Sequence, residues 1–257
     1  MATALTVGIL VGLTGVGAGA VMTPLLVGVF GVPFPVAIAT DLLFATITKA
    51  VGILPHHQAG SINWALARRM WWGSIPGTLV GVGLLLAVVG GERVGWLAWP
   101  LAAIVLLTAL TLARRALSSD GNGGGVAPMT NRPVKAWEPA AGGFGIGTAV
   151  SLTSVGAGAL GMALLVRLST PGTKPRHLVG TDLVHAIPIA LIAGVAYAIS
   201  GLVSWPLLGV LLVGSVPGVV IGSMLSGTAP SRVLNAILAV MLTLAVVLLV
   251  TKQLGVL

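Results

Sequence analysis

Apolar residues fill most of the chain and are interrupted at short intervals by polar segments. Hydropathy divides the sequence into apolar blocks near 4–31, 34–54, 65–90, 94–113, 139–166, 178–200, 203–226 and 233–251. A helix must cross roughly 30 Å of hydrocarbon to span a bilayer, and apolar stretches of that length follow one another almost without pause. The pattern predicts an all-α integral membrane protein that crosses the inner membrane several times.

The composition supports a membrane protein. Apolar residues make up 56% of the 257 residues, charged residues only 7%, and the mean hydropathy is +1.09. A soluble domain of this size could not cover its surface with so few polar side chains. The net charge of +8 sits in loops and at block ends, which indicates membrane orientation and not nucleic-acid binding. The chain has no cysteine, which excludes disulfides, thiolate metal sites and cysteine nucleophiles.

Two copies of one unit follow each other along the chain. A polar segment rich in glycine and serine separates them and is typical of a flexible aqueous linker. Four motifs of the first half return 139 to 141 residues later: VGAGA at Val16–Ala20 and Val155–Ala159, TDL at Thr40–Leu42 and Thr181–Leu183, SIPG at Ser74–Gly77 with SVPG at Ser215–Gly218, and RV at Arg93–Val94 and Arg232–Val233. We therefore predict a transmembrane repeat at 1–117, a cytoplasmic linker at 118–137 and a second transmembrane repeat at 138–257.

The distribution of Lys and Arg between the two membrane faces distinguishes two possible topologies. If all eight blocks are full spans, the halves are parallel, and Lys and Arg split seven to five between the two faces. If the first and fifth blocks fold back as re-entrant hairpins, each half has three spans plus a hairpin, and the halves are inverted. Ten basic residues then share one face, which the positive-inside rule favours. We expect the inverted arrangement, with hairpin arms of about a dozen residues or roughly 18 Å, and with both termini outside.

Glycine clusters interrupt the first and fifth blocks at equivalent places, and a threonine precedes each cluster. Close helix packing through small residues is one interpretation. The other is that a helix break frees backbone N–H groups beside the positive end of a half-helix, which makes an anion site near the midplane. The candidate substrate-binding residues are Thr14, Gly17, Ala18, Gly19, Thr40, Thr153, Gly156, Ala157, Gly158 and Thr181.

The two clusters carry a family resemblance. The segment GLTGVGAGAVMTPLLVGVFGVP (Gly12–Pro33) and its echo SLTSVGAGALGMALLV (Ser151–Val166) resemble the glycine-rich repeat of the TauE/SafE sulfite exporter family. The repeat, the central linker and the length are similar across the whole chain. The resemblance implies transport of a small sulfur-containing anion such as sulfite or an organosulfonate. The chain departs from the family pattern at Asp41 and Asp182, where a small polar residue is usual, and a carboxylate beside an anion path repels the anion.

These two aspartates lie in apolar blocks, where a carboxylate costs about 2.5–3.5 kcal/mol on insertion scales. One interpretation is that each caps a helix N-terminus, since each follows a threonine near the start of a block. The alternative is a carboxylate that lines the transport cavity and exchanges protons. His185 lies three residues after Asp182, on the same helical face, and could pair with it. Asp41, Asp182 and His185 are therefore the candidate proton-coupling residues.

Lys49 lies within the second block, eight residues after Asp41. Its side chain could reach the nearby membrane surface, as long basic side chains often do. If it instead turns inward, it is a fixed positive charge that can attract an anion. We keep it as the candidate counter-charge.

The function that this pattern favours is secondary transport. The chain has no phosphate-binding loop of the Gly-x-x-x-x-Gly-Lys type, so energy would come from an ion gradient. It also lacks the His-Glu-x-x-His and Gly-x-Ser-x-Gly motifs of membrane hydrolases, so we expect no catalytic residues, no metal and no cofactor. A small-anion channel, or a transporter of a carboxylate or another small solute, is the alternative. The expected partners are the anion and the lipid bilayer, and a homodimer is left open.

Overall fold

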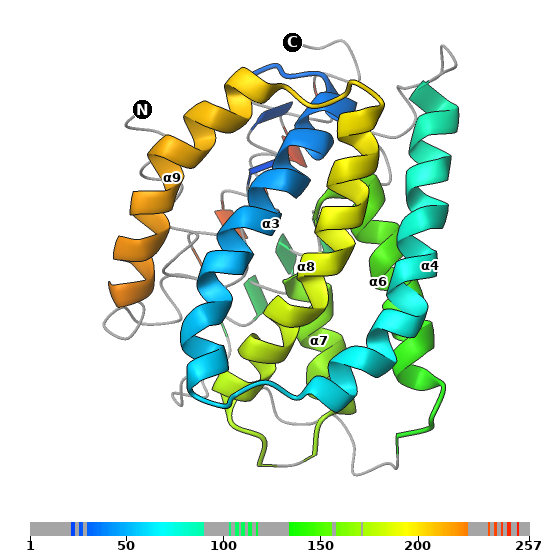
Figure 1. Cartoon of the computed structure of the whole chain (residues 1–257), viewed down its shortest axis with the longest axis vertical. Coiled ribbons are helices and arrows are strands. Elements are labelled where there is room, and N and C mark those ends of the chain that lie inside the picture. The colour runs from blue at the N-terminus through cyan, green and yellow to red at the C-terminus, as the bar shows by residue number, and fades with distance from the viewer. Residues whose placement is uncertain are drawn as a thin grey trace.

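The structure is a computed structural model. It describes residues 30–89, 134–155, 158–170 and 172–225, together with scattered positions within 22–27, 103–117 and 236–251. This part of the chain contains helices and no strands, which confirms the predicted all-α class. The helices are α3 (Phe34–Gln58), α4 (Trp64–Val89), α6 (Glu138–Thr153), α7 (Ala159–Leu168), α8 (Pro175–Ile199) and α9 (Trp205–Leu225), arranged side by side as Figure 1 shows.

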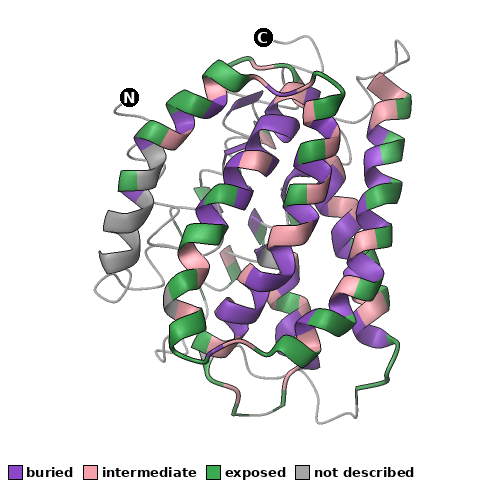
Figure 2. Cartoon of the chain, viewed as in Figure 1, coloured by how far each residue is buried: buried purple, intermediate pink, exposed green. Residues whose placement is uncertain are grey.

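Three of these helices are long and apolar enough to cross a membrane. They are α3, α4 and the part of α8 from Arg176 to Ile199. Large apolar side chains are exposed on the outer faces of the helices, among them Leu79, Val195 and Val213, while the sides that face each other are buried (Figure 2). Exposed apolar faces of this kind suit contact with lipid. The chain is a membrane protein, as its sequence predicts.

Helices in the two halves begin at matching places. Helix α8 starts at Pro175, 141 residues after the start of α3 at Phe34, and each helix has 25 residues. Helices α4 and α9 start at Trp64 and Trp205, again 141 residues apart, and each contains a proline. In Figure 1, α3 runs from top to bottom and α8 from bottom to top, whereas α4 runs upward and α9 downward. The helices at matching positions of the two halves therefore run in opposite directions.

The fifth apolar block is not one helix. The chain leaves α6 at Ser154, whose φ of 56° is left-handed, and its N–H donates to the carbonyl of Val150. An ion pair of 3.8 Å between Glu138 and Arg167 brings the start of α6 close to the end of α7, so the chain reverses at the break. With 16 and 10 residues, the arms are about 24 Å and 15 Å long. The first arm is longer than the expected dozen residues, but neither arm spans 30 Å.

Glycines bring α4 and α6 into backbone contact, which the sequence analysis missed. A Cβ atom on Gly77 would meet the backbone of Phe144, with its carbonyl carbon only 2.9 Å away. A Cβ on Gly147 would lie 2.9 Å from the carbonyl carbon of Ser74. The Thr148 hydroxyl also donates to the Gly77 carbonyl at 3.0 Å. Small residues of this kind let membrane helices approach closely, and here they fix the first arm of the hairpin against α4.

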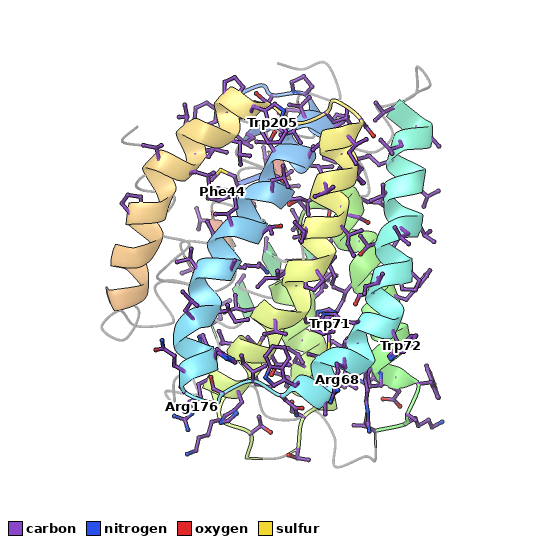
Figure 3. The ribbon with its side chains drawn as sticks, in the orientation of Figure 1. Phe44, Arg68, Trp71, Trp72, Arg176 and Trp205 are labelled. Atoms are coloured by element: carbon purple, nitrogen blue, oxygen red, sulfur yellow. The ribbon has the colours of Figure 1, made fainter. Side chains whose placement is uncertain are left out.

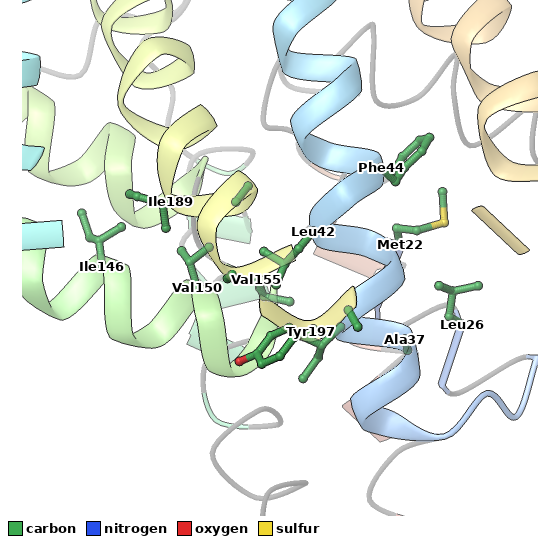
Figure 4. Packing of buried hydrophobic residues seen from close by; sticks show 14 of the residues in the cluster. Met22, Leu26, Ala37, Leu42, Phe44, Ile146, Val150, Val155, Ile189 and Tyr197 are labelled. Atoms are coloured by element: carbon green, nitrogen blue, oxygen red, sulfur yellow. The ribbon is translucent and has the colours of Figure 1, made fainter. Parts of the chain in front are cut away.

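An apolar core joins the hairpin to the long helices. Ile146, Val150 and Val155 lie beside Ile189 and Tyr197 of α8, as Figure 4 shows. The Tyr197 hydroxyl donates to the carbonyl of Ser151 at 2.8 Å, so this buried polar group is satisfied. The core therefore holds the break between α6 and α7 deep among the helices.

Basic side chains gather at one end of the described structure. Figure 3 shows Arg68 of α4 and Arg176 of α8 at the same end, opposite to Trp205. Arg167, at the end of α7, lies beside Glu138 at the start of α6. The segments before α4, before α6 and between α7 and α8 therefore share this end.

Candidate transport site

Four ionisable side chains are buried between α3 and α8. Asp41 and Lys49 come from α3, and Asp182 and His185 come from α8; their exposed fractions are 0%, 4%, 3% and 0%. Charged groups are rare within membrane-spanning segments because leaving water is costly, and those that occur usually have a function. The structure thus brings together all four residues that the sequence singles out for coupling or counter-charge. We call these four residues the buried charge cluster.

Asp41 is held by two hydroxyl groups. Thr23 and Ser154 donate to its Oδ2 atom at 2.5 Å and 2.9 Å, while its Oδ1 atom has no hydrogen-bond partner in the described part of the chain. Ser154 is the residue at the break between α6 and α7, so the hairpin contacts the charge cluster directly. Because α3 begins at Phe34, two turns before Asp41, the helix-cap interpretation of this aspartate is wrong.

Asp182 has a different environment from Asp41. Helix α8 begins at Pro175, so Asp182 is not a helix cap either. Its Oδ1 atom is buried and has no hydrogen-bond partner among the described residues. The carboxylate packs against the first turn of α7, where a Cβ on Gly161 would meet Oδ1 and lie 3.3 Å from Cγ. A larger residue at position 161 would require the Asp182 carboxylate to move.

Lys49 points into the protein and not to the membrane surface. Its Nζ atom is buried and makes no hydrogen bond within the described structure. The negative charges of Asp182 and Asp41 both act on this ammonium group. The interpretation that its side chain extends to the surface is therefore wrong, and the inward orientation is correct. Lys49 lies eight positions after Asp41, which is about 12 Å along α3.

His185 hydrogen-bonds to α4 and not to Asp182. Its Nε2 atom lies 2.9 Å from the Ser74 hydroxyl, and its carbonyl accepts a bond of 3.2 Å from the indole N–H of Trp71. Its Nδ1 atom has no partner among the residues described. The expected pairing of His185 with Asp182 is thus not made by a hydrogen bond, although both residues belong to the same face of α8. The role of His185 as a proton relay stays a prediction.

The two repeated threonines connect the halves. The hydroxyl of Thr40 accepts the backbone N–H of Ser204 at 3.1 Å, and that of Thr181 accepts the N–H of Asn63 at 3.0 Å. These bonds are counterparts, because both donors and acceptors are 141 residues apart. Each hydroxyl therefore hydrogen-bonds to the backbone just before a helix of the other half, so the two bonds link the halves.

Thr153 and Gly158, two further candidate substrate-binding residues, lie at the hairpin break. Thr153 accepts the N–H of Val155 at 3.2 Å and donates to the carbonyl of Ala149 at 2.7 Å, so its hydroxyl shapes the break. Gly158 is buried and directly precedes α7, and its carbonyl accepts the N–H of Met162. The remaining candidates lie outside the described residues: Thr14, Gly17, Ala18, Gly19, Gly156 and Ala157.

Comparison with known proteins identifies a transporter family. A family model described as "Sulfite exporter TauE/SafE" matches residues 1–249. The chain belongs to the TauE/SafE family. It is 34% identical over 244 residues to "Probable membrane transporter protein YjnA" of Bacillus subtilis (strain 168), covering 91% of this chain and 92% of that one. "Probable membrane transporter protein YdhB" of the same organism is 26% identical over 244 residues, with 93% of each chain covered. No solved structure matches.

Family membership confirms the resemblance seen in the glycine-rich segments. Members of the TauE/SafE family are membrane transporters and not enzymes, as expected from the sequence. The family match covers residues 1–249, so the description applies to nearly the whole chain.

This TauE/SafE chain also has a polar cavity that the sequence analysis missed. A cavity of about 450 Å³ lies where the start of α4, the end of α7 and the start of α8 meet, at the basic end of the structure. Its polar lining comes from Asn63, Ser169, Thr170, Thr173, Lys174, His177 and Thr181. Polar residues in the connection between the fifth and sixth blocks were the signal for it. One of the lining residues, Thr181, directly precedes Asp182 in α8.

Proposed function

We propose that the chain is a secondary transporter that carries a small anion, sulfite or an organosulfonate, across the inner membrane. The observation that carries this proposal is Lys49, a buried ammonium group without a hydrogen-bond partner in the described structure. It belongs to the same helix as Asp41, which accepts a hydrogen bond from Ser154 at the break between α6 and α7. A buried cation needs an anionic partner, and the family is that of a sulfite exporter. An anion at Lys49 would satisfy both requirements.

The anion would be held from two sides. Helix α7 begins at Ala159, so its first turn carries backbone N–H groups that lack partners within the helix, and its positive end points toward the break. The Lys49 ammonium supplies the opposite side, since it interacts with Asp182, which packs on that same turn. We propose that the glycine cluster of the first half contributes the equivalent N–H groups.

The proposed topology is that of two inverted repeats. Helices related by the 141-residue offset run in opposite directions, and α6 and α7 form a hairpin whose ends lie together. Eight parallel full spans would place Arg68 and Arg176 on opposite faces, whereas re-entrant hairpins place them on one face; both lie at the same end (Figure 3). By the positive-inside rule this end is cytoplasmic, together with the linker.

Inverted repeats supply a route to alternating access. The long helices α3 and α8 pack against each other in antiparallel orientation, and a hydroxyl-to-backbone bond joins the halves toward each end of this pair: Thr40 with Ser204, and Thr181 with Asn63. In repeat transporters, one half moves against the other around a central site. The cavity that borders Thr181 would then be the cytoplasmic entrance in this conformation.

A ligand screen tests this function. Purified protein would be screened by thermal shift against sulfite, thiosulfate, sulfoacetate, taurine, sulfate and simple carboxylates, because a ligand that binds the native state raises its apparent stability by mass action. We expect stabilisation by at least one sulfur oxyanion or sulfonate, abolished in Lys49→Gln and retained in Lys49→Arg. The absence of any stabilising anion, or full stabilisation of the Lys49→Gln variant, would contradict the proposed site.

A further inference from the structure

We propose that the carboxylate of Asp182 and the transported anion compete for Lys49, so that the anion binds only when Asp182 is protonated. This inference rests on the proposed function and adds the coupling step to it. The inference also gives a role to Asp182, whose ionised carboxylate repels an anion.

The geometry supports competition because the carboxylate occupies the place proposed for the anion. Asp182 packs against the first turn of α7 at Gly161, and its Oδ1 atom makes no hydrogen bond within the described structure. A Cβ atom on Gly52 would lie 3.9 Å from the side chain of Leu183, so α3 near Lys49 packs alongside α8 near Asp182. The charges of Asp182 and Lys49 act on each other across this contact. An ionised Asp182 therefore supplies what a bound anion would supply, a negative charge beside Lys49 and near the positive end of α7.

The two aspartates differ in their ability to remain ionised. Asp41 accepts hydrogen bonds from Thr23 and Ser154, and hydrogen bonds to a carboxylate favour its charged form. The Oδ1 atom lacks a donor in both residues, but no hydrogen bond to either oxygen of Asp182 is found among the described residues. Of the two carboxylates, Asp182 is therefore the one that takes up the proton.

Charge balance explains why a proton must accompany the anion. With both aspartates ionised and Lys49 charged, the cluster carries a net charge of −1 when His185 is neutral, and an anion would raise it to −2. The other described groups that contact the cluster are uncharged: Ser74 and Trp71 of α4, Ser154 at the hairpin break, and Thr23. The ionisable pair of the hairpin, Glu138 with Arg167, lies at the hairpin's open end, away from the break. One proton on Asp182 offsets the added charge, so a monoanion and one proton cross together.

The test is the pH dependence of anion binding. Methanesulfonate, sulfate and thiosulfate keep their charge from mildly acidic to mildly alkaline pH, whereas sulfite itself gains a proton near neutrality. We expect the dissociation constant of a binding anion, measured by calorimetry on the full-length protein, to rise with pH toward about tenfold per pH unit, the limit for one linked proton. Asp182→Asn should bind the anion at every pH with the affinity that the wild-type protein shows only at acidic pH. Lys49→Gln should bind no anion at any pH.

A matched control is Glu138→Gln, which removes a buried carboxylate away from the cluster; it should keep the wild-type pH slope. If Asp182→Asn does not fold, the pH dependence of the wild-type dissociation constant alone tests the competition. A wild-type affinity that does not change with pH, or an Asp182→Asn variant that keeps the slope, would overturn the competition while leaving anion transport intact. If none of the three anions binds the wild-type protein at any pH, the proposed function fails, and the inference fails with it.

Discussion

The contact between α4 and α6 permits a quantitative test of how the hairpin is held. Gly77 is buried in α4, and a Cβ atom there would meet the Phe144 backbone, 2.9 Å from the carbonyl carbon and 3.0 Å from Cα. Backbone atoms cannot rotate away as a side chain can, so Gly77→Ala must separate the two helices. Overpacking of this kind costs about 1–3 kcal/mol.

Gly83 in the same helix is the matched control. A Cβ atom there has no neighbour within 4 Å, so Gly83→Ala introduces no clash. In a helix interior, alanine is favoured over glycine by about 0.8–1 kcal/mol, which should stabilise this variant. The two alanine variants should therefore differ by roughly 2–4 kcal/mol in their free energy of unfolding.

Thermal unfolding of both purified variants in the same detergent measures this difference. For a chain of about this size, 1 kcal/mol shifts the Tm by roughly 2–4 °C, so Gly77→Ala should melt at least about 4 °C below Gly83→Ala. Gly77→Ala should also lower anion affinity, because the first arm of the hairpin carries Ser154 to Asp41. Equal melting temperatures for the two variants would refute the close backbone contact.

Three further predictions concern topology, the links between the halves and the glycine cluster. Because the chain has no cysteine, single cysteines introduced at Asn122, Ala2 and Val256 can be probed with a membrane-impermeant thiol reagent in intact cells. We expect labelling at Ala2 and Val256 only. Labelling at Asn122 alone would contradict the predicted topology. Thr181→Val leaves the backbone N–H of Asn63 without its acceptor and should lower the free energy of unfolding by about 1–3 kcal/mol, as measured by chemical denaturation. An unchanged free energy of unfolding would show that this hydrogen bond does not stabilise the protein. Gly158→Ala should fold normally but bind the anion more weakly; wild-type affinity would argue that this cluster serves packing.

The sequence predicted the helices well because hydrophobic length is a local property. The block at 34–54 became α3, and the block at 139–166 divides at residues 154–158, where its glycine cluster lies. The residues of the buried charge cluster could also be predicted from the sequence, since charged residues inside apolar blocks are costly and therefore rare. The inward orientation of Lys49 could not be predicted, because hydropathy does not say which face of a helix meets lipid.

The sequence alone could not predict which distant residues the fold brings into contact. Ser154 contacts Asp41 across 113 residues, and Ser74 contacts His185 across 111, and no local pattern links these pairs. The contact between α4 and α6 is a different case. The four-residue spacing of Gly73, Gly77 and Gly81, and of Gly143 and Gly147, is typical of closely packed membrane helices and was a usable signal.

The central claim, that Lys49 makes this chain a carrier of small sulfur-containing anions, is tested most directly by flux. Labelled sulfite would be loaded into proteoliposomes that contain the wild-type, Lys49→Gln or Lys49→Arg protein, and counterflow exchange would be measured against protein-free liposomes. We expect saturable exchange in the wild-type protein, none above background in Lys49→Gln, and recovery in Lys49→Arg. Wild-type flux no greater than that of empty liposomes, or undiminished exchange in Lys49→Gln, would contradict the claim.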